Sequence, residues 1–181
     1  MKQYNNETWP LYTCTACFVF NALKSFGVII EPEKVAKSLN IRVPIDVANP
    51  FGLTTTEDAN QYGLTTIEAK TNIRHLLSEH APLLIFKHLP LSEILYQMYE
   101  ETIDHYLNAG FQVGIGYDYS DLSNDSKVNR HVSFISRGNG YRITDYYEDQ
   151  KGMEIGLTIA KLIWSSSKIQ DGLWLIGKQN N

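Results

Sequence analysis

The chain of 181 residues is 43% hydrophobic and 20% charged, and its formal net charge is −4 at pH 7. A chain of this length and composition fits one domain, residues 1–181, with a buried core, and it is not intrinsically disordered. The negative charge, without a Lys/Arg stripe that alternates with aromatic residues, excludes phosphate-backbone binding as the main task, so we expect no nucleic-acid partner.

The N-terminal residues and the hydropathy of the chain predict a soluble protein. Residues 1–10, Met-Lys-Gln-Tyr-Asn-Asn-Glu-Thr-Trp-Pro, lack the apolar core of a signal peptide. No apolar run approaches the roughly 20 residues that would span a bilayer. We therefore expect no membrane span and, for the chain as written, a cytoplasmic location. Export without a signal peptide would leave no trace here.

The first part of the chain is predicted to be mainly helical. Residues 1–13 are expected to be extended, and residues 14–26 form an apolar run without Pro or Gly that Gly27 ends. This run has almost no polar face, which is typical of a helix buried on most sides. Two short helices are predicted over 33–39 and 73–77, and a strand over 83–86. A helix over 55–62 is predicted to begin at the cap Thr55. The longest predicted helix covers 92–108, with Ser92 as its cap.

After Gly110 the pattern changes from helical to strand-like. Strands are predicted over residues 113–117, 132–136, 141–145 and 173–176, with a polar loop over 120–130. Helices first and antiparallel strands second predict an α+β fold.

The two cysteines, Cys14 and Cys17, are too few for a disulfide scaffold, and no second Cys pair or close His pair completes a zinc site. Cys14 begins the predicted helix, where the N-terminal N–H groups and the helix dipole favour a thiolate. Cys17 lies one turn deeper, where burial favours an inert thiol. Cys14 is therefore a candidate nucleophile. Two alternatives stay open: both thiols are small buried hydrophobes, or they form the Cys-x-x-Cys of a thiol–disulfide exchange enzyme.

One histidine differs in its predicted setting from the other four. His131 opens the strand 131–136, whereas polar neighbours in or near helices predict a solvated surface position for the rest: His75, His80, His88 and His105.

A predicted hairpin brings a carboxylate to His131. The turn Gly138-Asn139-Gly140 leads into the strand that ends at Asp145. If the hairpin centres on Asn139, paired residue numbers sum to about 278, and His131 and Asp145 become diagonal neighbours on one face. Such a carboxylate orients the imidazole and stabilises its protonated form. A slip of one residue would separate the two side chains.

The same register makes a prediction for the rest of the strand. Ser133 is expected to face Asp145, while Val132 and Phe134 point the other way and pack into the core.

The order Gln3, Cys14, His131, Asp145 resembles the papain-like cysteine peptidases, most of all the bacteriocin-processing, double-glycine peptidase type. The resemblance rests on three stretches: Gln3 to Cys14, Cys14 to Gly27, and Arg130-His131-Val-Ser-Phe-Ile. Asp-Gly-Leu-Trp174-Leu-Ile is similar to the family's closing strand. The resemblance implies a papain-like cysteine protease fold, in which an N-terminal helical part with a buried nucleophile helix packs on a C-terminal antiparallel sheet.

By the same resemblance, Cys14, His131 and Asp145 form a catalytic triad, and Gln3 joins the Cys14 N–H in an oxyanion hole. Asn5 or Asn6 could supply that contact instead. The implied activity is hydrolysis of a peptide or amide bond through a thioester, with no cofactor and no metal. The sequence departs from the family at Thr15, where many members have Gly, and at Tyr146, where Pro is usual.

Two further functions fit the same fold. An acyltransferase would use the same triad but pass the acyl group to an amine or alcohol instead of water. A catalytically inactive papain-like binding module would have an unreactive Cys14.

Overall fold

The structure is a computed structural model that describes residues 12–94, 96–123, 130–138, 140–145, 153–154 and 158–179. Contacts group the chain into two compact units, Met1–Leu84 with Tyr146–Met153, and Ile85–Asp145 with Glu154–Asn181. The expectation of a single domain, residues 1–181, stays a prediction. None of the helices in the described part of the chain is long and apolar enough to cross a bilayer.

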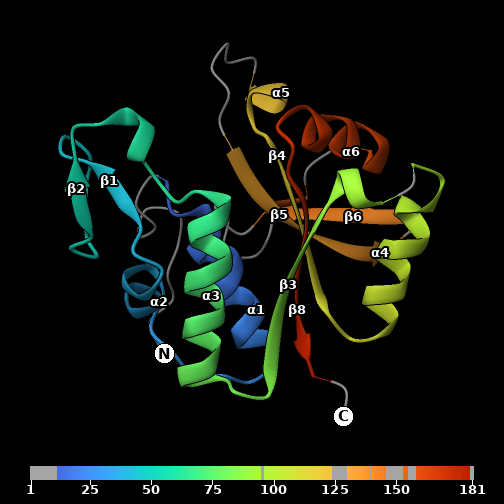
Figure 1. Cartoon of the computed structure of the whole chain (residues 1–181), viewed down its shortest axis with the longest axis horizontal. Coiled ribbons are helices and arrows are strands. Elements are labelled where there is room, and N and C mark those ends of the chain that lie inside the picture. The colour runs from blue at the N-terminus through green and yellow to red at the C-terminus, as the bar shows by residue number, and fades with distance from the viewer. Residues whose placement is uncertain are drawn as a thin grey trace. The chain divides into compact units, whose positions relative to one another are not determined.

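The described residues of the first unit form the α-helices α1 (Cys14–Ser25), α2 (Pro32–Ser38) and α3 (Thr66–His80) (Figure 1). α1 confirms the helix predicted over 14–26, and Gly27 ends it with a left-handed φ of 77°. The inward residues of α1 are almost wholly buried: Ala16, Phe18, Val19, Ala22 and Leu23. α2 confirms the short helix predicted over 33–39.

One prediction in this unit is wrong, and the helical turn predicted over 73–77 is confirmed but too short. Thr55 does not cap a helix but lies in a strand, β2 (Thr54–Thr56), which pairs in parallel with β1 (Arg42–Pro44). A 3₁₀ turn, η2 (Ala59–Gln61), follows, and the Asp58 side chain accepts a hydrogen bond from the Asn60 N–H. The turn predicted over 73–77 belongs to the much longer α3, which begins with a capping box between Thr65 and Glu68.

The second unit is built on a six-stranded sheet with the order β3-β8-β4-β5-β6-β7. Four strands confirm the predictions for the C-terminal half: β4 (Gln112–Asp118), β5 (Arg130–Gly138), β6 (Gly140–Asp145) and β8 (Gly172–Lys178). β3 (Leu84–Pro90) is longer than predicted, and β7 is the short Met153–Glu154. Helices preceding strands in an antiparallel sheet confirm the α+β class.

Helices α4 (Tyr99–Asn108) and α6 (Ile159–Lys168) belong to the second unit (Figure 1), and both contribute side chains to its core. Ile103 from α4 and Leu162 from α6 join Val113, Ile115 and Leu175 in the buried core of the unit. α6 was not predicted.

The helix predicted over 92–108 with Ser92 as its cap is wrong in its first half. Leu91–Glu93 and Tyr96–Met98 form short 3₁₀ turns, η3 and η4, before α4 begins. The Leu91 N–H donates to Asp171 O over 3.1 Å, and the Tyr99 hydroxyl donates to Leu91 O over 3.1 Å. These contacts tie Leu91, at the start of η3, to the residue before β8 and to α4. The longest helix among the described residues is α3 instead.

Candidate active site

Cys14 is the first residue of α1 and is partly exposed. Thr13, which precedes it, is fully buried, and its carbonyl accepts the Cys17 N–H over 3.0 Å. The first turn of α1 contains no acidic residue, so no negative side chain of this helix opposes a thiolate there. The apolar packing of α1 makes it a rigid support for this thiol.

Cys17 has the buried setting that its sequence predicts. Its side chain is 3% exposed, and the Asn21 side-chain amide donates to Cys17 O over 2.9 Å and lies 3.5 Å from Cys17 Sγ. Neither cysteine takes part in a disulfide. Cys17 is thus a packing residue of α1.

His131 lies at the start of β5 and is 6% exposed. Its ring is flanked by two tyrosines: Tyr117 stands edge-on with the ring centroids 5.6 Å apart, and Tyr119 is tilted at 4.9 Å. Tyr117 is also the cross-strand neighbour of His131 on β4, and its hydroxyl lies 3.0 Å from the Ser133 hydroxyl. Two aromatic rings therefore contact the imidazole.

The strand start that carries His131 is tied to the turn before β8. The Arg130 guanidinium donates to Ile169 O over 3.0 Å and lies 3.8 Å from Asp171 Oδ2. The backbone next to Tyr119 is tied to α6, because the Asp118 N–H donates to the Ser165 hydroxyl over 3.1 Å.

The hairpin register agrees with the sequence prediction. The cross-strand pairs of β5 and β6 run from Phe134 opposite Thr144 to Gly138 opposite Gly140, and the two residue numbers of each pair sum to 278. The diagonal relation of His131 to Asp145 follows from the same register but stays a prediction, since the Asp145 side chain lies outside the described part of the structure.

The prediction that Val132 and Phe134 pack into the core is confirmed, but the opposite face of β5 is buried as well. Ser133 and Ile135 stand opposite Ile115 and Val113, so their face also carries core residues of this unit. Val132 and Phe134 are buried as well, at 7% and 8%, but on the opposite face. His131 therefore shares its sheet face with the core.

The remaining site predictions are not tested. Gln3, Asn5 and Asn6 lie outside the described residues. Cys14 belongs to the first unit, and His131 and Asp145 belong to the second. The assembly of the three into a triad stays a prediction.

A buried histidine–aspartate pair was missed, and the expectation that His88 is solvated is wrong. His88 Nε2 lies 2.9 Å from Asp171 Oδ1, and the two side chains are 2% and 4% exposed. Asp171 Oδ1 also accepts the Gly172 N–H and the Trp174 indole N–H. His88 Nδ1 is buried, and it has no hydrogen-bond partner among the residues that the structure describes.

The charge of Asp171 is stabilised by these donors. Burial alone raises the pKa of this carboxyl, but the hydrogen bonds from His88 and Trp174, with that from Gly172, outweigh it and hold the pKa below its usual value. A signal was present in the sequence: Asp171 is a lone carboxylate directly before the apolar Gly-Leu-Trp strand.

Comparison with known proteins supports the fold. The crystal structure of a proposed C39-like peptidase from Bacillus anthracis superposes with a TM-score of 0.58 at 14% sequence identity, covering 95% of this chain and 92% of that one. No protein-family profile and no curated protein matches the sequence. The chain therefore has an α+β, papain-like fold of the C39-like peptidase kind.

Proposed function

We propose that the protein is a cysteine peptidase or amidase with Cys14 as its nucleophile, His131 as its base and Asp145 as the residue that orients the base. One observation carries the proposal: the partly exposed thiol of the chain is the first residue of a buried helix, in a fold shared with a C39-like peptidase. The ring contacts of Tyr117 and Tyr119 with His131 support its role as the base, because a base must be oriented toward the proton that it takes.

The first half of the reaction forms a thioester. His131 takes the proton of the Cys14 thiol, and the thiolate attacks the carbonyl carbon, forming a C–S bond while an electron pair moves to oxygen. The Cys14 N–H and the Gln3 amide donate to this oxyanion. Protonated His131 then gives its proton to the leaving amine as the C–N bond breaks.

The second half returns the enzyme to its starting state. Water loses a proton to His131 and attacks the thioester carbonyl, the C–S bond breaks, and Cys14 recovers its proton from His131. The substrate is a peptide or another amide. Within the chain itself, Cys17 serves as a matched control for Cys14, because it lies on the same helix and is buried.

Acylation by p-nitrophenyl acetate tests the proposal without knowledge of the natural substrate. Thiolate attack releases p-nitrophenolate and leaves an acetyl thioester, which mass spectrometry locates. We expect acetyl-Cys14 in the wild type and in Cys17→Ser, and at least about 100-fold slower acetylation in His131→Ala. Acetylation of Cys14 no faster than that of N-acetylcysteine would refute the proposal.

A further inference from the structure

Tyr12, two residues before Cys14, has an unusual backbone conformation. Its φ is 69°, in the left-handed region that bulky side chains rarely adopt. Such a conformation persists only where the surrounding structure holds it, and it is concentrated at functional sites. The Tyr12 side chain is 39% exposed, so burial of its ring is not what fixes it.

Two residues of the segment before α3 contact Tyr12. The Tyr62 ring lies 5.1 Å from the Tyr12 ring. Gly63 packs beside the Tyr12 backbone, where an added Cβ would lie in ordinary van der Waals contact with Tyr12 O, at 3.4 Å. The left-handed φ of Gly63, 73°, favours glycine there. Tyr62 and Gly63 therefore support both the ring and the carbonyl of Tyr12.

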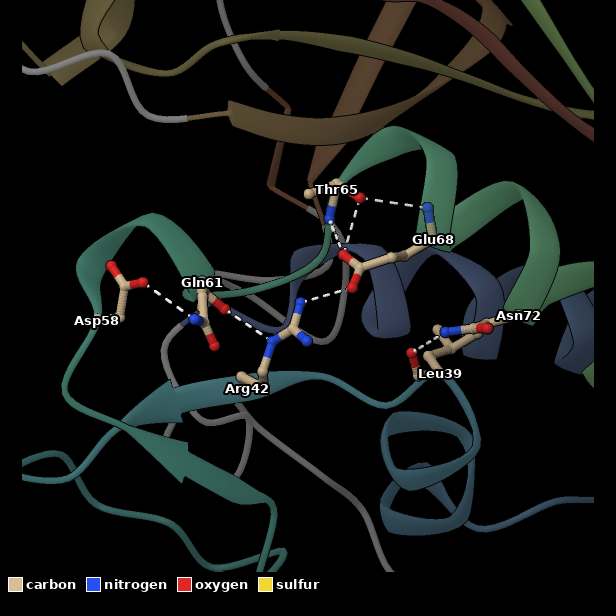
Figure 2. Close-up of polar contacts among 7 residues, drawn as sticks. All are labelled: Leu39, Arg42, Asp58, Gln61, Thr65, Glu68 and Asn72. Carbon is tan, nitrogen blue, oxygen red and sulfur yellow. Dashed lines mark hydrogen bonds and ion pairs between the residues drawn. The ribbon is translucent and has the colours of Figure 1, made fainter.

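This segment is itself held by Arg42 (Figure 2). The Arg42 backbone exchanges two hydrogen bonds with Gly63, of 2.7 and 3.2 Å. Its side chain donates to Gln61 O over 3.0 Å and to Glu68 Oε1 over 2.7 Å. Glu68 in turn accepts the Thr65 N–H over 3.0 Å. Arg42 thus fixes the chain on both sides of Tyr62.

The ionised state of Glu68 keeps this network together. The hydrogen bond from the Thr65 N–H outweighs the effect of partial burial and, with Arg42, holds the pKa of Glu68 below its usual value. The Arg42–Glu68 ion pair is therefore present at neutral pH.

We propose that Tyr12 is a positioning residue for the oxyanion hole: its left-handed backbone, supported by Tyr62 and Gly63, sets the course of the chain into α1 and hence the direction of the Cys14 N–H. This inference rests on the proposed function. Only Thr13 separates Tyr12 from Cys14, and it is fully buried. A change in the backbone direction at Tyr12 therefore also changes the backbone direction at Cys14.

Two reactions of the Cys14 thiol distinguish an effect on the direction of the Cys14 N–H from an effect on the nucleophilicity of the thiolate. Acylation by p-nitrophenyl acetate passes through a tetrahedral oxyanion that accepts the Cys14 N–H. Alkylation by iodoacetamide forms a C–S bond at a methylene group and expels iodide, and no oxyanion develops. The ratio of the acylation rate to the alkylation rate of Cys14 therefore reports the direction of that N–H.

Tyr12→Val and Tyr12→Asn form a matched pair. Both remove the ring, but Asn tolerates a left-handed φ and Val does not. We expect the ratio to fall at least about 10-fold in Tyr12→Val, a fraction of the loss from deleting a whole oxyanion donor. In Tyr12→Asn it stays within about twofold of the wild type. Asn40→Val, which removes a left-handed asparagine elsewhere in the unit, controls for strain in general and leaves the ratio unchanged.

Tyr62→Leu keeps the inference testable if Tyr12→Val does not fold, and we expect its ratio to fall about threefold. An unchanged ratio in folded Tyr12→Val, an equal fall in the Val and Asn variants, or an unchanged ratio in Tyr62→Leu when Tyr12→Val is unfolded would overturn it. Failure of the proposed function appears elsewhere, in wild-type Cys14 that is acylated no faster than N-acetylcysteine.

Discussion

The imidazole of His88 and the carboxylate of Asp171 form a buried pair, with Nε2 and Oδ1 2.9 Å apart. The pair joins β3 to the start of β8, and Trp174 stands edge-on to the His88 ring with the centroids 5.5 Å apart. Asp171 accepts three hydrogen bonds through one oxygen. Removing this carboxylate leaves three buried donors without their acceptor.

Asp171→Ala is therefore expected to lower the free energy of unfolding by about 3 kcal/mol or more, because each buried donor left without an acceptor costs about 1–3 kcal/mol. Urea denaturation followed by tryptophan fluorescence measures the change. Asp46→Ala removes an exposed carboxylate and should change stability by no more than about 0.5 kcal/mol. Equal effects of the two substitutions would contradict the structural importance of the pair.

The same carboxylate predicts a pH dependence of stability. The pKa of Asp171 is lower in the folded protein than its ordinary value of 3.8. Its ionised form therefore stabilises the fold above about pH 4, and this contribution is lost as the pH falls through the folded pKa. The imidazole of His88 on β3 and the guanidinium of Arg130 on β5 face this carboxylate. We expect stability to decline less steeply below about pH 4 in Asp171→Asn than in the wild type. Parallel curves would refute this.

Two strand glycines differ in what an added methyl group would meet. At Gly116 a Cβ would overlap the Asp171 carboxylate, whereas at Gly138 it would meet the flexible side chain of Arg142. Gly116→Ala should therefore cost about 1–3 kcal/mol through overpacking, and Gly138→Ala about 0.5 kcal/mol or less. Thermal unfolding of the two variants tests this. A Gly138→Ala variant that is the less stable of the two would be inconsistent with the register of Asp171 against β4.

The aromatic rings that contact His131 are predicted to raise the reaction rate of Cys14. Tyr119→Leu removes a ring whose centroid lies 4.9 Å from the imidazole, while Tyr119→Phe keeps it. If ring orientation matters to the base, alkylation of Cys14 slows several-fold, at least about threefold, in the Leu variant and is unchanged in the Phe variant. Stopped-flow alkylation gives both rates. A Phe variant as slow as the Leu variant would assign the effect to the hydroxyl instead.

Short-range patterns predicted the parts of the structure that depend on local chemistry. The α1 helix ends at Gly27, and the hairpin register follows from the Gly138-Asn139-Gly140 turn, because both features are encoded within a few residues. The cysteine that begins α1 was found for the same reason.

The errors arose where distant residues decide the local structure. β2 exists because Thr54–Thr56 pair in parallel with β1, which no local pattern reveals. Short 3₁₀ turns replace the first half of the helix predicted at Ser92, next to Leu91, whose N–H donates to the distant Asp171 O. His88 looked solvated because its partner, Asp171, is 83 positions away in the sequence.

The alkylation of Cys14 by iodoacetamide at about pH 6, where an ordinary thiol is almost wholly protonated, tests the central claim most directly. Mass spectrometry identifies the labelled cysteine in the wild type, His131→Ala and Cys17→Ser. We predict that Cys14 reacts at least about 10-fold faster than N-acetylcysteine in the wild type and in Cys17→Ser. In His131→Ala we predict that it slows to the rate of the small thiol. A Cys14 that reacts no faster than N-acetylcysteine, or equally fast without His131, would contradict the account and favour a binding module with the same fold.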